Sequence, residues 1–311
     1  MDDLKHLITP SLLTLLVEAR IPFSPAAPLN FGEVARKTFG AGPFLPTIEP
    51  KAWPVLVALS KAGLDALSPE FLMANFLPPP ASAEFPRQCL GMQLLLDQAP
   101  RSLCRGVDGR WRSCYFDVVS QRFARSWLAL PDDQRPDSQT RWCTELGASF
   151  DYWTCVRFWM GAPFVHSESA ENQAIALEFT DTTRRAVEAK TGVTDPWRAK
   201  RDEVLSDIYG FPRVARAGPP LGEDVTLETW SWWWMMLIDI HKPVIDRFGR
   251  YPYNNEVRGR ESTKEELEWR EKMDHFAEEP PEVLEQLVED YKAGIWQPLG
   301  AGKKDDQRKF K

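Results

Sequence analysis

Residues 229–266 read TWSWWWMMLIDIHKPVIDRFGRYPYNNEVRGRESTKEE. In the first half of this stretch, apolar side chains and one histidine recur at spacings of three and four residues: Trp230, Trp233, Trp234, Leu237, Ile238, His241 and Ile245. Such spacing predicts a helix over residues 229–248 that buries one face. At the other end, Ser262 or Thr263 followed by two glutamates is typical of a helix N-terminus. The sequence therefore predicts two helices and a segment that joins them.

The joining segment is rich in arginine and aromatic side chains. Within fourteen residues it places Arg247, Phe248, Arg250, Tyr251, Tyr253, Arg258 and Arg260. Its glycines and proline, and the pair Asn254 and Asn255, predict an irregular loop. Loops held between anchored helices commonly display binding groups, and guanidinium groups bind carboxylates and phosphates through paired hydrogen bonds. In the alternative interpretation, these arginines only pair with carboxylates of the protein itself, such as Asp97, Glu168 and Glu261.

Composition is typical of a water-soluble globular protein. The 311 residues are 43% hydrophobic and 27% charged, with a net charge of −7. That charge gives no overall basic field for nucleic acid, although a local basic face would suffice for an RNA partner. The 13 tryptophans predict a large aromatic core or an aromatic-lined cavity.

The cysteines and the N-terminus indicate the compartment. The five cysteines are scattered and lack a CxxC pair, which indicates reduced thiols in the cytoplasm. The first residues, MDDLKHLITPSLL, lack the basic start and continuous apolar run of a signal peptide. The longest apolar run, around residues 232–238, is too short to cross a bilayer. We therefore expect a cytoplasmic protein without a membrane partner.

Helical periodicity without alternating strands predicts an all-α fold. Helices are expected over residues 8–19, 53–67, 69–76, 88–98, 115–130, 140–160, 168–190 and 280–292. The expected organisation is a proline-rich helical N-terminal region (1–84), a core (85–275) with an irregular insertion (191–225), a C-terminal helix (276–299) and a basic disordered tail (300–311). Six prolines between residues 21 and 50 argue against a long helix there.

Two short runs place ionisable groups beside apolar helices. Asp97 follows three leucines, so its carboxylate is expected to be partly buried and to need a partner such as Arg101. His166, Ser167 and Glu168 follow one another, and a histidine beside a carboxylate can act as acid or base. The structural alternatives are a buried Asp–Arg pair for the first run and a helix N-cap at Ser167 for the second.

The sequence contains no pattern typical of a metal or nucleotide-cofactor site. The four histidines, at positions 6, 166, 241 and 275, are far apart and lack the spacing of metal ligands. The short glycine runs at residues 40–44 and 300–304 lack the surrounding strand and helix of a phosphate-binding loop. We therefore expect no metal and no cofactor. The residues alone predict a helical protein with one polar, arginine-rich pocket.

Three segments together resemble the domain-of-unknown-function 924 family. They are QLLLDQAPRSLCRG (93–106), APFVHSE (162–168) and DRFGRYPYNNEVRGRESTKEE (246–266), in the family's order, and the resemblance covers roughly residues 85–270. It implies an all-helical, TPR-like fold. The sequence departs from the family at Ala99, where an aromatic residue is usual, and at Ser102, where asparagine is usual. Tyr253 and Asn254 stand where the family has histidine and arginine.

The family includes a fungal branch of arginine-containing cyclodipeptide synthases, which use aminoacyl-tRNAs. The resemblance implies that arginyl-tRNA and a second aminoacyl-tRNA are joined here into a cyclo-Arg-Xaa diketopiperazine. His166 is then the expected base, Asp97 and Glu168 bind the arginine guanidinium, and a hydroxyl of Ser102 or Ser167 would carry any acyl-enzyme. The substrate-binding residues that it implies are Arg101, Ser167, Arg247, Arg250, Tyr253, Asn255 and Arg260.

Two other function classes are compatible with the sequence. A TPR-like fold also suits a non-catalytic scaffold, in which the arginine cluster would hold an acidic peptide or a carboxylate ligand. A small-molecule hydrolase or transferase that uses His166 and Glu168 would need no RNA. Alanine substitution of Asp97, Glu168 and His166 separates these classes, because an enzyme loses turnover whereas a structural network first loses thermal stability.

Overall fold

Helices account for all the regular structure in residues 2–39 and 44–301, the parts of the chain that the computed structural model describes, and these parts contain no strand. The all-α prediction is confirmed. The N-terminal part contains α1 (Asp2–Leu7), α2 (Pro10–Arg20), α3 (Phe31–Thr38), α4 (Phe44–Ser60) and α5 (Pro69–Phe76). The middle part contains α6 (Phe85–Gln93), α7 (Ala99–Leu103), α8 (Gly109–Trp111), α9 (Asp117–Leu128), α10 (Phe150–Val165) and α11 (Ala170–Thr191). The last part contains α12 (Arg201–Val204), α13 (Gly210–Ala217), α14 (Leu227–Asp239), α15 (Lys242–Phe248), α16 (Lys264–Lys272) and α17 (Pro281–Lys292).

Tighter and wider helical turns connect these helices. The π-helical turns are η2 (Leu94–Gln98), η4 (Arg112–Phe116) and η5 (Thr140–Glu145). The 3-10 turns are η1 (Leu64–Leu67), η3 (Gly106–Asp108), η6 (Pro196–Lys200), η7 (Pro252–Asn254) and η8 (Glu256–Arg258).

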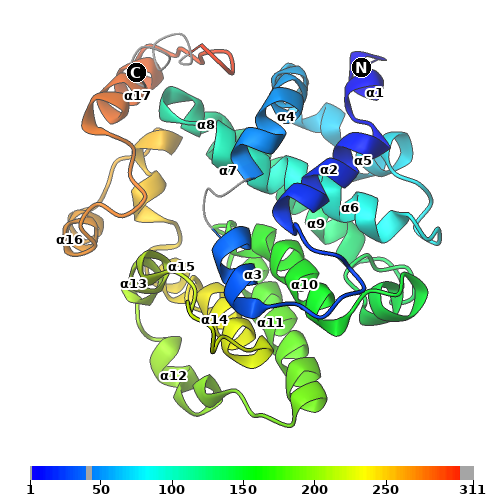
Figure 1. The fold of residues 1–311 in the computed structure, drawn as a ribbon. Helices are drawn as coiled ribbons and strands as arrows, with labels where there is room; N and C mark the ends of the chain where they lie inside the picture. The colour runs from blue at the N-terminus through cyan, green and yellow to red at the C-terminus, as the bar shows by residue number, and fades with distance from the viewer. Residues whose placement is uncertain (1, 40–43, 302–311) are drawn as a thin grey trace.

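Helix α14 carries most of the stripe predicted from the sequence. It packs against α10 and α11, which also contact each other (Figure 1). All seven residues of the stripe predicted over residues 229–248 are buried, none more than 8% exposed. The predicted single helix is nevertheless two, because Pro243 has no N–H to donate one turn back, and the chain breaks at Ile240 and His241 between α14 and α15. At the far side of the loop, Thr263 caps α16 as predicted, and Glu266 completes a capping box.

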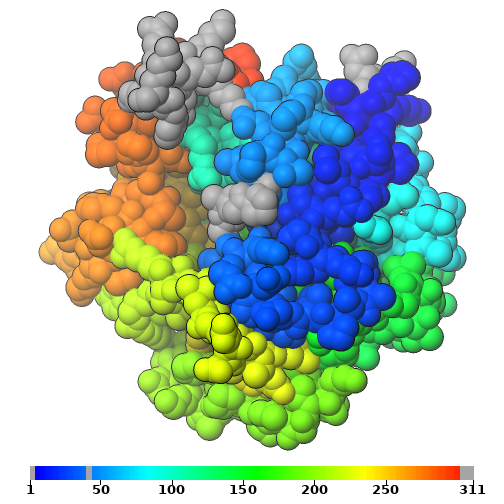
Figure 2. All heavy atoms as spheres, viewed as in Figure 1, coloured from blue at the N-terminus to red at the C-terminus, as the bar shows by residue number. Residues whose placement is uncertain are grey.

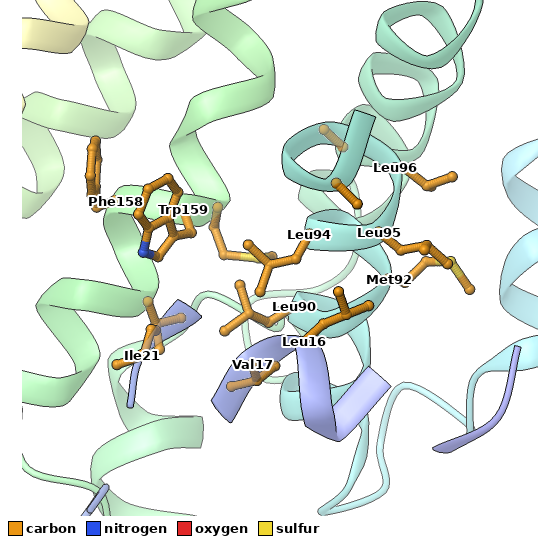
Figure 3. Packing of buried hydrophobic residues seen from close by; sticks show 14 of the residues in the cluster. Leu16, Val17, Ile21, Leu90, Met92, Leu94, Leu95, Leu96, Phe158 and Trp159 are labelled. Atoms are coloured by element: carbon orange, nitrogen blue, oxygen red, sulfur yellow. The ribbon is translucent and has the colours of Figure 1, made fainter. Parts of the chain in front are cut away.

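Helix α2 crosses α6 at a glycine. A methyl group added at Gly91 would lie 2.3 Å from the carbonyl oxygen of Leu13, so only glycine allows this close approach of the two backbones. Leu16 of α2, Leu90 of α6 and Trp159 of α10 belong to the cluster around this crossing (Figure 3). The N-terminal region therefore shares one core with helices α6 to α14, and Figure 2 shows its blue segments packed against the green and yellow ones.

Helix α4 contradicts the expectation that residues 21–50 hold no part of a long helix, and the helix expected over residues 53–67 instead begins at Phe44 and ends at Ser60. It runs for 17 residues from Phe44 and includes Pro46, Pro50 and Pro54. These prolines are four residues apart and all exposed, so the carbonyl groups of Pro46 and Pro50, which lose their helical partners at Pro50 and Pro54, lie on the solvent side of the helix. The opposite face is buried and holds the helix in place through Phe44, Ile48, Ala52, Val55, Leu56 and Leu59.

Three other expectations are corrected. The helix expected over residues 140–160 is divided into η5 and α10, because Ser149 caps a new helix start. Helix α10 then continues through Pro163 to Val165, since a proline in the last turn removes only one hydrogen bond from a helix with a buried final turn. The insertion expected to be irregular (191–225) contains α12 and α13.

The C-terminal helix is confirmed as α17, and the residues after it return to α8. Arg110 donates to the carbonyl oxygen of Ile295 at 2.9 Å, and the indole nitrogen of Trp111 donates to that of Gln297 at 2.9 Å. The predicted basic tail lies outside the described residues from position 302 onwards. Among the helices of the described part, none combines the length and the apolar character needed to span a membrane.

Candidate active site

Asp97 lies in η2, the widened turn between α6 and α7. The three leucines before it are fully buried, which draws this turn into the core. Pro100 has no N–H to donate to Leu96, and the N–H of Ala99 donates to Leu94, five residues back, which makes the turn wider than an α-helix. As a result the carboxylate of Asp97 lies inside the protein, with its side chain 1% exposed.

Three side chains hold this carboxylate. Oδ1 lies 2.8 Å from Nδ1 of His166 and 3.7 Å from Nε of Arg101. Oδ2 accepts a hydrogen bond of 2.5 Å from Nε2 of Gln98. Burial raises the pKa of Asp97, but the charges of His166 and Arg101 and the hydrogen bonds from His166 and Gln98 outweigh it and lower that pKa to about 2. Asp97 is therefore ionised at neutral pH.

The ionised carboxylate orients His166, which follows the last turn of α10. Nδ1 of His166 lies 2.8 Å from Oδ1 of Asp97 and 2.9 Å from Nε of Arg101. A carboxylate only accepts and a guanidinium only donates, so this ring nitrogen can engage one of them at a time. The buried charge of Asp97 favours a proton on Nδ1, which leaves Nε2 as a proton acceptor. In this tautomer histidine can act as a base toward a bound molecule.

A cavity of about 440 Å³ lies beside His166, and the imidazole is part of its wall. Aromatic and aliphatic side chains form much of the wall, among them Phe39, Leu45, Trp159, Phe211, Tyr253 and Phe276. Its polar part includes Arg20, Arg101, Arg105, Arg112, Asp117 and His241. The volume suits a small ligand or the reacting end of a larger one.

Positive charge prevails in this wall. Asp117 is the only carboxylate among the described residues that line the cavity, and its Oδ1 accepts a 2.6 Å hydrogen bond from Arg101. In the described part of the chain, no carboxylate lies within ion-pair distance of Arg20, Arg105 or Arg112. Burial and the neighbouring charge of Arg101 lower the pKa of Arg112. The cavity therefore favours a ligand that carries negative charge.

His241 is a second histidine of the wall, and it is neutral. Its Nδ1 lies 2.7 Å from the carbonyl oxygen of Leu237, which places the proton on Nδ1, and its ring centroid lies 3.8 Å from that of Phe211. Burial first, and then the charge of His166, lower the pKa of His241 to about 3. Nε2 of His241 is therefore a hydrogen-bond acceptor at neutral pH.

Glu168 lies outside the cavity wall and fastens the arginine-rich loop. Its two carboxylate oxygens accept hydrogen bonds of 2.8 and 2.9 Å from Arg260, and Oε1 also accepts one of 3.0 Å from the backbone N–H of Tyr251. Arg258 lies 3.7 Å away. Because these groups occupy the carboxylate, Glu168 positions the loop that carries Tyr251 and Tyr253 into the cavity wall. Arg260 therefore pairs with a carboxylate of the protein itself, which is the alternative interpretation of the arginine cluster.

The other arginines of the loop also pair with carboxylates of the protein. Arg250 binds both oxygens of Glu266 at 2.6 and 2.8 Å, and the exposed Arg247 binds Glu265 at 2.6 Å. These two arginines and Arg260 do not line the cavity, and a substrate-binding role for them stays a prediction.

Ser167 and Asn255 also have structural contacts. The hydroxyl oxygen of Ser167 accepts from the amide of Asn172 at 2.8 Å and from the N–H of Ser169 at 3.1 Å, and Ser169 is the residue that caps α11. Asn255 donates to Ser262 at 3.0 Å. Ser102, in contrast, lines the cavity. Of the predicted site residues, Arg101, Ser102, His166 and Tyr253 line the cavity, and the buried Asp97 contacts the wall residue His166.

Sequence reasoning missed five ionisable residues of the cavity wall: Arg20, Arg105, Arg112, Asp117 and His241. His241 belongs to the apolar stripe and was interpreted only as part of its buried face. Arg20 interrupts the apolar end of α2, between Ala19 and Ile21, which is a weak signal for a buried charge. Its contact with Gln98 spans 78 positions of sequence, and local patterns cannot predict it.

Comparison with known proteins identifies a family but no individual relative. A family model described as a bacterial protein of unknown function (DUF924) matches residues 78–274, more than half of the chain. The match contains all three segments that carry the resemblance, and it begins after α5, so Arg20 lies outside it. No curated protein and no solved structure matches the chain. In the described residues, no group of histidine, cysteine and acidic side chains is arranged to hold a metal ion.

Proposed function

The chain belongs to the DUF924 family, and we propose that its cavity is the active site of an acyl-transferring enzyme in which His166 is the general base. The observation that carries this proposal is the buried, ionised Asp97, whose Oδ1 lies 2.8 Å from Nδ1 of His166 at the cavity wall. A histidine held in one tautomer by a buried carboxylate can take a proton from a nucleophile and return it to a leaving group.

The acyl donors in this proposal are aminoacyl-tRNAs, one of them arginyl-tRNA, as in the synthase branch of the family that the three sequence segments resemble. Arg105 is exposed and, with Arg112, suits the backbone phosphates of a tRNA acceptor end. Tyr253 and Phe276 offer ring faces on which a terminal base can stack. The product is then a cyclo-Arg-Xaa diketopiperazine.

The reaction needs only proton transfer between groups that are present. The α-amine of one aminoacyl group attacks the ester carbon of the other, and Nε2 of His166 takes the amine proton as the C–N bond forms. It returns that proton to the ribose oxygen as the C–O bond breaks, which releases the first tRNA. The remaining free amine attacks the second ester in the same way, which closes the ring and releases the second tRNA. Arg101 stabilises negative charge that develops on the carbonyl oxygen.

The expected recognition of the arginine guanidinium changes in this arrangement. The sequence assigned that task to Asp97 and Glu168, but both carboxylates are engaged by groups of the protein. The described cavity wall offers aromatic ring faces and the acceptor Nε2 of His241 instead.

One observation favours a second candidate, an RNA-independent hydrolase or transferase that acts on a small acid. The wall contains four arginines and one carboxylate among its described residues, which suits a substrate with its own carboxylate or phosphate. His166 would then activate water or a substrate hydroxyl.

Mass spectrometry of extracts from a bacterial expression host tests the first candidate. We expect a cyclo-Arg-Xaa product, and in lysate reactions we expect it to disappear on treatment with ribonuclease. His166→Asn should lower product formation by about 100-fold or more in protein that stays folded. Arg247→Ala is the matched control, because Arg247 is exposed and outside the cavity. A product that survives either ribonuclease or His166→Asn would refute the proposal. Folded protein without this product, but with His166-dependent turnover of small acids, would establish the second candidate.

A further inference from the structure

Arg20 is a buried cation, and no carboxylate of the described residues lies within ion-pair distance of it. Only 4% of it is exposed, and within the described residues its Nε has no hydrogen-bond partner. Burial lowers the pKa of its guanidinium to about 9, and the charge of Asp97 offsets only part of this effect. Arg20 is therefore charged at neutral pH. A buried charge without a partner is strongly unfavourable in a folded protein, so this arrangement calls for an explanation.

The contacts that Arg20 makes hold its guanidinium in place but leave hydrogen-bond donors and its charge without a partner in the described residues. Its terminal nitrogens donate to the carbonyl oxygen of Thr38 and to Oε1 of Gln98, both at 3.4 Å, which is longer than an ordinary hydrogen bond. The guanidinium carbon lies 3.6 Å from the ring centroid of Phe44 and 4.4 Å from that of Trp159. The rings hold the flat group through cation–π contacts, and its edge keeps unused donors at the cavity wall.

We propose that Arg20 binds the oxyanion of the cavity's ligand, a carboxylate or phosphate attached to an apolar body. A guanidinium edge matches an oxyanion through two parallel hydrogen bonds. Phe39, Leu45 and Trp159 supply apolar wall near this end for the carbon part of the ligand. The inference rests on the part of the proposed function that places a ligand in the cavity, and not on acyl transfer.

A chain of hydrogen bonds connects Arg20 to His166. Arg20 donates to Gln98, Gln98 donates to Asp97 at 2.5 Å, and Asp97 lies 2.8 Å from Nδ1 of His166. A ligand whose anionic end binds Arg20 is therefore held in a fixed position relative to His166. A carbon atom in the apolar part of the ligand then lies beside His166. For an aminoacyl substrate, the matching group is the side-chain carboxylate of aspartate or glutamate.

Arg20 also shows what the N-terminal region contributes. It is the last residue of α2, outside the residues 78–274 that match the family. The close crossing of α2 over α6 at Gly91 fixes the position of the C-terminal end of α2, and with it Arg20, relative to the cavity. The anion-binding group is thus supplied by a part of the chain that the family match does not include.

Binding of small aromatic probes to the full chain tests this proposal. Benzoate and phenyl phosphate should bind and raise the melting temperature, whereas benzamide, an uncharged analogue of benzoate, should not. Which of the two anions binds more tightly in calorimetry identifies the oxyanion as carboxylate or phosphate. Arg20→Met keeps the length of the side chain and removes its charge, and it should weaken anion binding about 10-fold to 100-fold. Because the lost charge is unpaired, Arg20→Met should melt at the same or a higher temperature without ligand.

Two controls make the outcome decisive. Arg141→Met removes another buried arginine, whose guanidinium donates to the carbonyl oxygens of Pro80 at 2.8 Å and Ser82 at 2.5 Å, away from the cavity. This variant should melt at a lower temperature and bind the anions normally. His166→Asn should also bind them normally, so that loss of turnover can be told apart from loss of the anion site. If Arg20→Met melts as low as Arg141→Met and anions bind no better than benzamide, Arg20 is structural and the proposal is wrong.

Discussion

Replacing Asp97 by asparagine removes one buried negative charge and keeps the shape of the side chain. In the folded protein the pKa of Asp97 falls from its ordinary value of 3.8 to about 2. This difference stabilises the folded state by about 2 kcal/mol at neutral pH. Because folding lowers this pKa, the contribution is complete above about pH 4 and is lost as the pH falls through about 2. Asp97→Asn should therefore lower the free energy of unfolding by about 2 kcal/mol or more at pH 7, since Arg101 also loses a partner.

The same substitution should change the proton position on His166. An asparagine can offer an N–H to Nδ1, which moves the ring proton to Nε2 and removes the base from the cavity side. The equivalent change in a Ser–His–Asp triad lowers turnover by about 10⁴-fold, and we expect a loss approaching that size here. The loss should appear in kcat while the folded structure is retained.

Urea unfolding followed by tryptophan fluorescence measures the stability part of this prediction at a series of pH values. The wild type and Asp97→Asn should differ most at pH 7 and converge as the pH approaches 2. Asp202→Asn is the control, because Asp202 is exposed on the short helix α12. A difference in unfolding free energy that stays constant with pH would show that the charge of Asp97 does not stabilise the fold. Unchanged turnover of Asp97→Asn would refute the proposal that Asp97 orients His166 as a base.

Three further substitutions test the geometry around the cavity. Glu168→Gln should lower the free energy of unfolding by about 3 kcal/mol in urea titrations, because Arg258 and Arg260 lose their carboxylate, whereas the exposed Arg247→Ala should change it by less than about 0.5 kcal/mol. Below about pH 6.5 the wild-type imidazole of His241 is protonated only on unfolding, so the stability of the wild type should fall by up to about 1.4 kcal/mol for each pH unit in thermal melts. His241→Gln should abolish this decline. Gly91→Ala should cost about 1–3 kcal/mol through its clash with Leu13 and should weaken anion binding by displacing Arg20; normal calorimetric binding would contradict that coupling.

Local patterns predict the helices of this fold because helices are stabilised between residues that are near in sequence. The three-and-four spacing of the tryptophan stripe identified the buried face of α14 and α15, and α5, α11 and α17 begin and end within a few residues of their predicted bounds. The prediction for α4 is wrong because proline was counted without regard to its position. The three prolines lie on one exposed face, and the free energy lost with their hydrogen bonds is smaller than the free energy gained by packing the buried opposite face.

The candidate site was only partly predictable, because its contacts join distant segments. Asp97 and His166 were identified as ionisable groups beside apolar helices, and the structure brings them together across 69 positions of sequence. The widened turn η2 that turns Asp97 inward has no simple sequence signal apart from Pro100. Arg20 could not be assigned to the cavity at all, because its location depends on how α2 crosses α6.

Neutralisation, and not clustering in sequence, separates the structural arginines of this protein from those suited to a ligand. Arg250 and Arg260 each use two nitrogens on one carboxylate, so their donors and most of their field are consumed inside the protein. Arg20 and Arg112 have no such partner in the described residues, and burial lowers the pKa of both. A reaction that builds negative charge beside His166 gains most from guanidinium groups that are still unpaired. The arginines that are dense in the sequence therefore hold the loop together, and the scattered ones make the cavity attractive to an anion.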